Sequence, residues 1–402
     1  MINKYIKDNL PKTIRVMEDD NYPFFALPCP YNVPCASGMF QEMYYWDSYF
    51  TNRGLLLDGD IGQAKNNVDN LVAMAERFGF VLNGNRVEFL NNSQPPFMSE
   101  MIRDIYEVTK DKLWLTQVMH AIEIEYRFYT EKRGSEIGLS HYDAVLPITE
   151  EQKMRGVELL TQRLGYTPDG TLDELARGLY AVGESGWDIN PRMTYRAYDY
   201  LTAELNSLIY SMENNMEYFS HEIGREAEAR MWHERKERRA GLCREYLKDD
   251  EGIFYDYDMK AERRTSLFSA ACYYPLFFGM ATAEEAEAAV RKLPLIETEW
   301  GTVTSVRCDD IPGTFQWGYP NGWPPMQQII VGGLLRYGYT EDAERIATKF
   351  LRLIEKTFAK TGHLWEKYNV VKGSGEALAE YETPAMLGWT YGTYRVFTEL
   401  LG

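Results

Sequence analysis

The sequence of 402 residues has few cysteines, few histidines and no long apolar run. Its five cysteines form no CxxC pair, which argues against a disulfide framework. Its five histidines lie far apart, without an HxH or HxxxH pair, so we expect no zinc site. No stretch of about 18 apolar residues is present, which predicts no membrane span. The N-terminus also lacks the apolar segment of a signal peptide, and we therefore expect a reducing, cytoplasmic location.

Positive charge is neither abundant nor clustered. The formal net charge is −17, and the basic residues are spread through the chain, which argues against nucleic acids and anionic membranes as partners. Aromatic residues, in contrast, make up 14% of the chain, with 29 Tyr and 9 Trp. Such aromatic faces stack on sugar rings, although a tyrosine-rich core is an alternative explanation. The composition favours an acidic soluble protein and gives no indication of its oligomeric state.

Helical spacing dominates the chain and recurs. The segments Leu55–Gly59 and Leu334–Gly338 are each followed by apolar residues at the same offsets, and a looser copy ends at Gly279. Each reads as a helix, a glycine C-cap, a short turn and a second helix. Repeated helical hairpins with few strand patterns predict an all-α toroid. We expect one catalytic barrel over residues 39–402, preceded by an irregular, proline-rich arm over residues 1–38 that packs on it.

One acid stands outside any helical pattern. Asp188 follows Trp187 in a stretch that contains Gly186 and Pro191, so we expect a loop between two helices to present it. An indole neighbour and a shortage of nearby positive charge favour the protonated carboxyl group that a proton donor requires. Taken alone, an N-cap for the following helix explains this aspartate equally well.

Two further loops carry polar or aromatic groups on turns that proline stiffens. Gln94 precedes Pro95-Pro96, and the indoles of Trp317 and Trp323 lie on either side of Pro320. Side chains held in this way hydrogen-bond sugar hydroxyls or stack on sugar rings. The alternative is that they only close their loops.

A third loop contains an acid beside a base. Glu366 precedes Lys367, and a lysine close to the carboxylate favours the ionised form that a general base requires. As an isolated observation, such a neighbouring pair is more often found on the surface than in an active site.

Taken together and in order, these motifs resemble the trehalases of glycoside hydrolase family 37. The piece Ser93–Pro96 also resembles the neighbouring family 63, but Tyr319–Trp323 and Glu366–Tyr368 favour family 37. The resemblance spans nearly the whole chain. It rests on the stretches Gly38–Phe50, Val68–Asn70, Asn83–Arg86, Ser93–Pro96, Glu184–Asp188, Gln316–Trp323 and Glu366–Tyr368.

The resemblance implies an (α/α)6 toroidal barrel and an inverting hydrolysis that uses no cofactor. It places the general acid on Asp188 and the general base on Glu366. In an inverting enzyme the acid protonates the departing oxygen while the base activates a water molecule on the opposite face of the sugar. The residues that match the family's glucose pocket are Phe40, Tyr44, Trp46, Asp47, Asn70, Gln94, Gly186, Trp317 and Glu380.

Arginines that are typical of the family are missing. Met39 stands where trehalases have the arginine of Pro-Gly-Gly-Arg-Phe, and Asn92 replaces the arginine before Ser93. No stretch between Gly138 and Gly183 matches the family's Arg-Pro-Glu-Ser. The family uses these arginines around the leaving group, where each lost hydrogen bond costs about 1–3 kcal/mol. The sequence therefore predicts an unchanged glycosyl pocket and an altered leaving-group pocket.

We therefore expect an exo-acting, inverting α-glycosidase that removes a glucose-like unit from a disaccharide or small glycoside, with trehalose as one candidate. One alternative is a family 63-like hydrolase of mannosyl- or glucosylglycerate, in which Arg86 or Arg192 would bind the glycerate. Another is a catalytically silent sugar-binding barrel, which the retention of both carboxylates disfavours. Sugar epimerases share the toroid but use histidines, and none of the five lies in the matched motifs.

Overall fold

Six helices form an inner ring in the computed structural model, which describes residues 1–402. Each inner helix packs against the next along the chain, and the last packs against the first and closes the ring. The inner helices are α2 (Tyr45–Leu57), α4 (Met98–Thr109), α8 (Ala203–Glu222), α10 (Tyr274–Phe277), α12 (Pro324–Arg336) and α14 (Gly388–Leu401).

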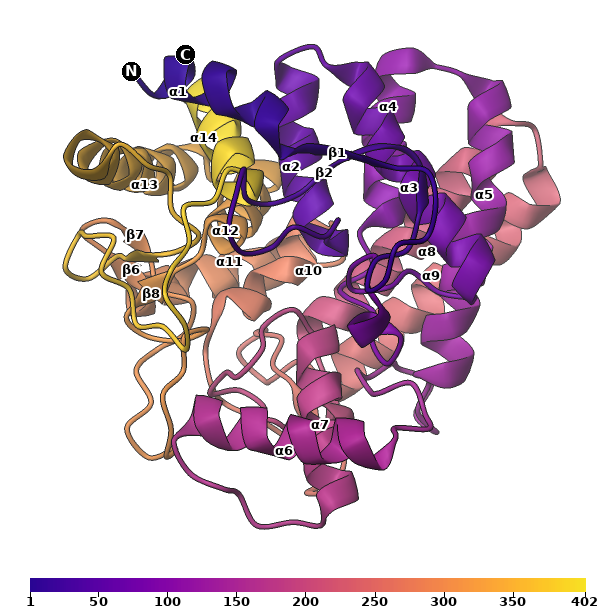
Figure 1. Ribbon diagram of the computed structural model, residues 1–402. Coiled ribbons are helices and arrows are strands. Elements are labelled where there is room, and N and C mark those ends of the chain that lie inside the picture. The colour runs from indigo at the N-terminus through magenta and orange to yellow at the C-terminus, as the bar shows by residue number, and fades with distance from the viewer.

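A second set of helices packs outside this ring: α3 (Ile61–Phe78), α5 (Lys112–Arg127), α9 (Glu226–Tyr246), α11 (Ala283–Lys292) and α13 (Thr340–Thr361). The sixth outer position belongs to α1 (Ile2–Asn9), whose Tyr5 ring lies edge-on to Phe358 of α13, with centroids 5.2 Å apart. The two chain ends consequently lie side by side (Figure 1). The predicted (α/α)6 toroidal barrel is confirmed.

The predicted hairpin glycines adopt the left-handed backbone conformation. Gly59, Gly279 and Gly338 have φ angles of 80°, 74° and 81°, and each separates an inner helix from the following outer helix. A side chain is strained at such angles, which is why glycine ends these helices. The signal could be read from the sequence because it depends on the local backbone alone.

Helices α6 (Glu150–Leu164) and α7 (Leu172–Glu184) interrupt the alternation of inner and outer helices. They pack against each other and lie at one end of the barrel, away from the termini (magenta in Figure 1). Capping boxes at Thr149 and Thr171 fix where the two helices begin. Gly156 of α6 faces α7, and a Cβ there would make an ordinary van der Waals contact with the Leu179 side chain, at 3.5 Å. This hairpin forms one wall of the candidate site.

The prediction of an irregular arm over residues 1–38 does not hold. The segment contains α1 and an antiparallel pair of strands, β1 (Ile14–Met17) and β2 (Leu27–Asn32). The prolines of β2 suggested irregular structure, but they fall where the ladder between β1 and β2 shifts register and needs no regular hydrogen bonds. Ile2 and Ile6 belong to the same hydrophobic cluster as the barrel helices.

The remaining strands are short. β3 (Tyr200–Leu201), β4 (Tyr257–Asp258) and β5 (Arg263–Arg264) form one sheet, and β6 (Glu297–Thr298) pairs with β7 (Gly301–Thr302). β8 (Asn321–Gly322) pairs antiparallel with β9 (Tyr368–Asn369), which ties the loop of Trp317 to the loop of Glu366. None of the helices combines the length and apolar character that a membrane span requires.

Glu125 of α5 is a buried carboxylic acid whose titration we expect to affect stability. The Tyr45 hydroxyl donates to Oε1 at 2.5 Å, and Oε2 has no partner. Burial raises the pKa of Glu125 from 4.5 to about 8. The folded protein therefore keeps a proton that the unfolded chain loses near pH 4.5. We expect stability to fall as the pH rises from there to about 8, by at most about 1.4 kcal/mol per pH unit.

Urea unfolding at several pH values across this window tests that expectation. Glu125→Gln removes the titrating group and should flatten the decline, whereas Glu158→Gln on the exposed face of α6 should leave it unchanged. An equal slope in the wild type and in Glu125→Gln would assign the decline to other groups.

Candidate active site

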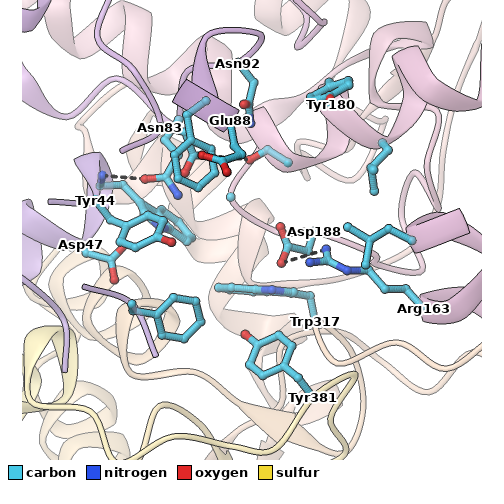
Figure 2. Close-up of a pocket in the computed structure, with 18 of the residues that line it drawn as sticks. Tyr44, Asp47, Asn83, Glu88, Asn92, Arg163, Tyr180, Asp188, Trp317 and Tyr381 are labelled. Atoms are coloured by element: carbon cyan, nitrogen blue, oxygen red, sulfur yellow. Dashed lines mark hydrogen bonds and ion pairs between the residues drawn. The ribbon is translucent and has the colours of Figure 1, made fainter. Parts of the chain in front are cut away.

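A cavity of about 330 Å³ lies between the inner helices and the α6–α7 hairpin (Figure 2). Its wall includes both predicted catalytic residues and most of the predicted glucose contacts. Only Asn70 and Glu380 of the predicted set are absent from the wall. The predicted residues that line the cavity are Phe40, Tyr44, Trp46, Asp47, Gln94, Gly186, Asp188, Trp317 and Glu366.

Asn70 has a structural role. Its side-chain amide accepts from the backbone N–H of Cys29 at 2.9 Å and donates to the Cys29 carbonyl at 3.0 Å. It thus holds β2 against the outer helix α3, and the prediction that it binds the sugar does not hold. Asn83, which sequence reasoning missed, lines the cavity instead. Its amide donates to the carbonyls of Ser93 and Gly183 at 3.2 and 3.3 Å.

Arg163 of α6 contacts both the predicted acid and Glu380. Its Nη1 lies 3.3 Å from Oδ2 of Asp188 (Figure 2). Its Nε lies 3.4 Å from Oε2 of Glu380, whose side chain is buried. The prediction that Asp188 has little positive charge nearby is therefore wrong. Burial raises the pKa of Glu380 to about 8, and neither of its oxygens has a hydrogen-bond partner. Glu380 lies behind the cavity wall and reaches the site through Arg163.

The loop that presents Asp188 is anchored at its start by a buried ion pair. Arg133 donates to both oxygens of Glu184, at 2.7 and 2.8 Å. Glu184 also accepts from the backbone N–H of Ser93 at 3.0 Å, next to Gln94. The Gln94 side chain in turn accepts from the backbone N–H of Trp46 at 3.1 Å. The loops that carry Gln94 and Asp188 are therefore fixed to one another.

The same loop is anchored at its end by Arg192. This side chain is 1% exposed and donates to Glu204 at 2.5 Å and to Asp256 at 2.6 Å. Arg86, the other predicted ligand for a glycerate carboxylate, forms ion pairs with Glu42 and Glu88. Both arginines are already engaged and neither lines the cavity, so the prediction that they bind a substrate anion does not hold.

The backbone is strained at the site itself. Asp188 has a φ of 29° and Phe40 a φ of 54°, in a region that costs a residue other than glycine about 1–3 kcal/mol. Gly186 has a φ of 71°, and a Cβ at this position would lie 2.9 Å from the Trp46 indole. The packing of Trp46 against this glycine determines how the loop presents its acid.

Glu366 is held by three donors. Its Oε1 accepts from the Tyr381 hydroxyl at 2.7 Å, its Oε2 forms an ion pair with Lys367, and its carbonyl accepts from Trp389 Nε1 at 2.9 Å. The predicted proximity of Lys367 is confirmed, and the pair is buried. Burial raises the pKa of Glu366, while the Lys367 ammonium and the Tyr381 hydroxyl act in the opposite direction. The carboxylate is thus fixed in position by Tyr381 and Lys367.

Stacked indoles form the floor of the cavity. Trp317 stacks on Trp323 with ring centroids 3.7 Å apart, and Figure 2 shows its ring between Asp188 and Tyr381. Trp187 stacks on the Trp317 ring but is fully buried and does not line the cavity. The indole exposed to the cavity near Asp188 is therefore Trp317, and not its neighbour in the sequence.

Asp47 brings a third carboxyl group to the cavity. Burial raises the pKa of Asp47 well above its usual range, and the nearby Glu366 carboxylate adds to the effect. Three acids with different surroundings, Asp47, Asp188 and Glu366, thus face one cavity. Such an arrangement suits proton transfer to and from a bound sugar. No group of three or more His, Cys, Asp or Glu side chains is placed to hold a metal ion.

The wall contributed by α6 was missed from the sequence. Gln152, Arg155, Leu159 and Arg163 line the cavity and recur every three to four residues, as on one face of a helix. This spacing can be read from the sequence and indicates that the four residues share one face of a helix. Which face of α6 meets the cavity depends on how the hairpin docks on the barrel, and the sequence alone does not show this.

The trehalase family matches residues 2–402. Periplasmic trehalases of Xanthomonas axonopodis pv. citri and Escherichia coli O1:K1 are each 30% identical to this chain, over 91% and 93% of it and 67% and 69% of those proteins. The neutral trehalase from Saccharomyces cerevisiae superposes with a TM-score of 0.79 at 28% identity, over 93% of this chain and 74% of that one. A family 63 mannosylglycerate hydrolase from Thermus thermophilus shares the fold, with a TM-score of 0.66 at 15% identity over 99% of this chain and 100% of that one. This chain therefore belongs to the trehalase family and is a glycoside hydrolase.

Proposed function

We propose that this enzyme hydrolyses trehalose or a closely related small α-glucoside, releasing a terminal glucose unit with inversion. One observation carries the proposal. Asp188 and Glu366, from loops far apart in the sequence, line the same cavity together with most of the predicted glucose contacts. The cavity also has an indole floor on which a sugar ring can stack.

The chemistry requires one proton donor and one proton acceptor. In the proposed reaction, the Asp188 carboxyl proton moves to the glycosidic oxygen as the bond from that oxygen to the anomeric carbon breaks. Glu366 takes a proton from water, whose oxygen bonds to the anomeric carbon from the opposite face. One water molecule is consumed, and both products leave as neutral sugars. Lys367 and Tyr381 orient the base for this step.

The contact between Arg163 and Asp188 has to change during this cycle. The Arg163 guanidinium lies 3.3 Å from Oδ2 of Asp188, so a leaving group that contacts this carboxyl group has to displace it. We infer that a bound leaving group separates Asp188 from Arg163. Glu380, 3.4 Å from Nε of Arg163, remains next to the guanidinium after this separation.

The alternatives from the sequence receive less support. A silent sugar-binding barrel has no need for a buried carboxylate held by both a lysine and a tyrosine, as Glu366 is. A glycerate-binding site at Arg86 or Arg192 is disfavoured by their existing ion pairs and by their absence from the cavity wall. The cytoplasmic location stays a prediction. All five cysteines are free thiols, as the expected absence of a disulfide framework requires.

The test is hydrolysis of α,α-trehalose followed by proton NMR at early times. Inversion at the attacked glucose gives one β-glucose, while the departing glucose leaves as the α anomer, so we expect equal amounts of both before mutarotation. Release of α-glucose alone would show retention and overturn the proposed roles. Maltose, kojibiose and sucrose serve as comparison substrates. No hydrolysis of any of them would overturn the proposed substrate class.

A further inference from the structure

Arg155 lines the active-site cavity and has no ion-pair partner. The other arginines near the site are all engaged: Arg163 with Asp188 and Glu380, and Arg133 with Glu184. Glu88 is a further acid in the cavity wall, and it is paired with Arg86. Arg155 therefore presents an uncompensated, solvent-accessible guanidinium to the cavity in a chain whose net charge is −17.

The position of Arg155 on α6 determines which part of a substrate it can reach. Arg163 marks the level of the glycosidic oxygen, because it contacts the proposed acid Asp188. Arg155 lies eight residues earlier on the same helix face, about 12 Å along the axis. The wall that α6 forms supplies none of the predicted glucose contacts, and we therefore assign Arg155 to the far side of a sugar in the leaving-group position.

A second donor lies close to this guanidinium. Tyr180 of α7 also lines the cavity, and the charge of Arg155 is near enough to oppose the rise in the pKa of Tyr180 that burial causes. A guanidinium and a phenol hydroxyl together offer several hydrogen-bond donors and no negative charge. Arginine suits phosphate in particular, because its planar fork pairs with two phosphate oxygens at once.

We propose that Arg155, with Tyr180, selects substrates whose leaving sugar carries an anionic group remote from the glycosidic bond, and that a phosphate ester is the class that fits. This inference rests on the proposed function and names the substrate class of the same site. The reaction is the same as the one proposed for trehalose. Water cleaves the glycosidic bond, and the phosphate ester stays on the departing sugar. A carboxylate attached next to the glycosidic oxygen, as in glucosylglycerate, would fall near Arg163 instead.

The experiment compares kcat/KM for trehalose 6-phosphate and for trehalose, expressed as a ratio. We expect the ratio to exceed one in the wild type and to fall about tenfold in Arg155→Met, because a charge-assisted hydrogen bond is lost. Arg155→Lys keeps the charge and should retain part of the ratio. The matched control is Arg238→Met, since Arg238 is an exposed arginine without an ion pair on α9, outside the cavity. Added salt should lower the ratio in the wild type but not in Arg155→Met.

The possible outcomes separate this inference from the proposed function. Efficient cleavage of trehalose with a ratio below one, or with a ratio that Arg155→Met and salt leave unchanged, overturns the inference alone. Faster cleavage of glucosylglycerate than of trehalose 6-phosphate would place anion recognition near Arg163 and would also overturn the inference about Arg155. Hydrolysis of none of these substrates overturns the proposed function as well. Loss of turnover of the phosphorylated substrate in Asp188→Asn assigns that turnover to this site.

Discussion

Asp188→Asn and Glu366→Gln are each expected to lower kcat/KM by about 10²- to 10⁴-fold, the usual contribution of a positioned acid or base. Both substitutions preserve size and polarity and remove only the ability to transfer a proton. Glu158→Gln, at an exposed position of α6, is the matched control and should retain wild-type activity. Circular dichroism and unfolding curves establish that the inactive variants are folded.

The two roles can be separated with a substrate that needs no acid. Fluoride leaves without protonation, so Asp188→Asn should recover most of its activity on α-glucosyl fluoride, while Glu366→Gln should stay inactive. If Glu366→Gln recovered its activity on the fluoride and Asp188→Asn did not, Glu366 would be the acid and Asp188 the base. If both variants hydrolyse their best substrate within a few-fold of the wild type, then neither residue is the acid or the base.

Arg192→Met is expected to destabilise the fold by about 3–5 kcal/mol, because it leaves Glu204 and Asp256 buried without their counter-charge. Urea unfolding measures this change. Arg291→Met, which breaks an exposed pair with Glu287, should cost less than about 1 kcal/mol and is the control.

A triple variant tests the cause of this destabilisation. Adding Glu204→Gln and Asp256→Asn to Arg192→Met removes the buried charges and should recover part of the lost stability. No recovery would show that Arg192 acts mainly through its packing against the Trp187 ring, 4.5 Å away. A loss below about 1 kcal/mol in Arg192→Met itself would contradict the importance of this anchor for the Asp188 loop.

The parts of the fold that depend on local backbone chemistry were predicted well. The glycines at 59, 279 and 338 end helices because their φ angles are positive, and this requirement is visible in the sequence. The N-terminal segment was misread because its prolines suggested irregular structure, whereas a register shift between two strands accommodates them. Pairing between distant strands leaves little local signal.

The candidate site was predicted correctly where the matched motifs lie on loops or at the start of an inner helix, and it was missed where the docking of one element on another decides which residues reach the cavity. Asn70 and Asn83 are both asparagines in matched stretches, yet only Asn83 faces the cavity, because Asn70 belongs to an outer helix. Arg163 was missed because α6 belongs to an inserted hairpin whose orientation is set by tertiary contacts. Trp187 is adjacent to Asp188 in the sequence but is turned into the core, which only the three-dimensional packing shows.

The closure of the ring by its last helix has a consequence during synthesis of the chain. Trp389 of α14 holds the carbonyl of Glu366, and α14 is also the helix that meets α2. A ribosome-bound chain that has not yet released α14 therefore leaves an inner face of α2 uncovered and the Glu366 loop without its support. The earlier helix pairs can assemble as they emerge, but the Glu366 loop gains its support only when α14 docks. Until then, the nascent chain exposes an aromatic surface that other chains or chaperones can bind.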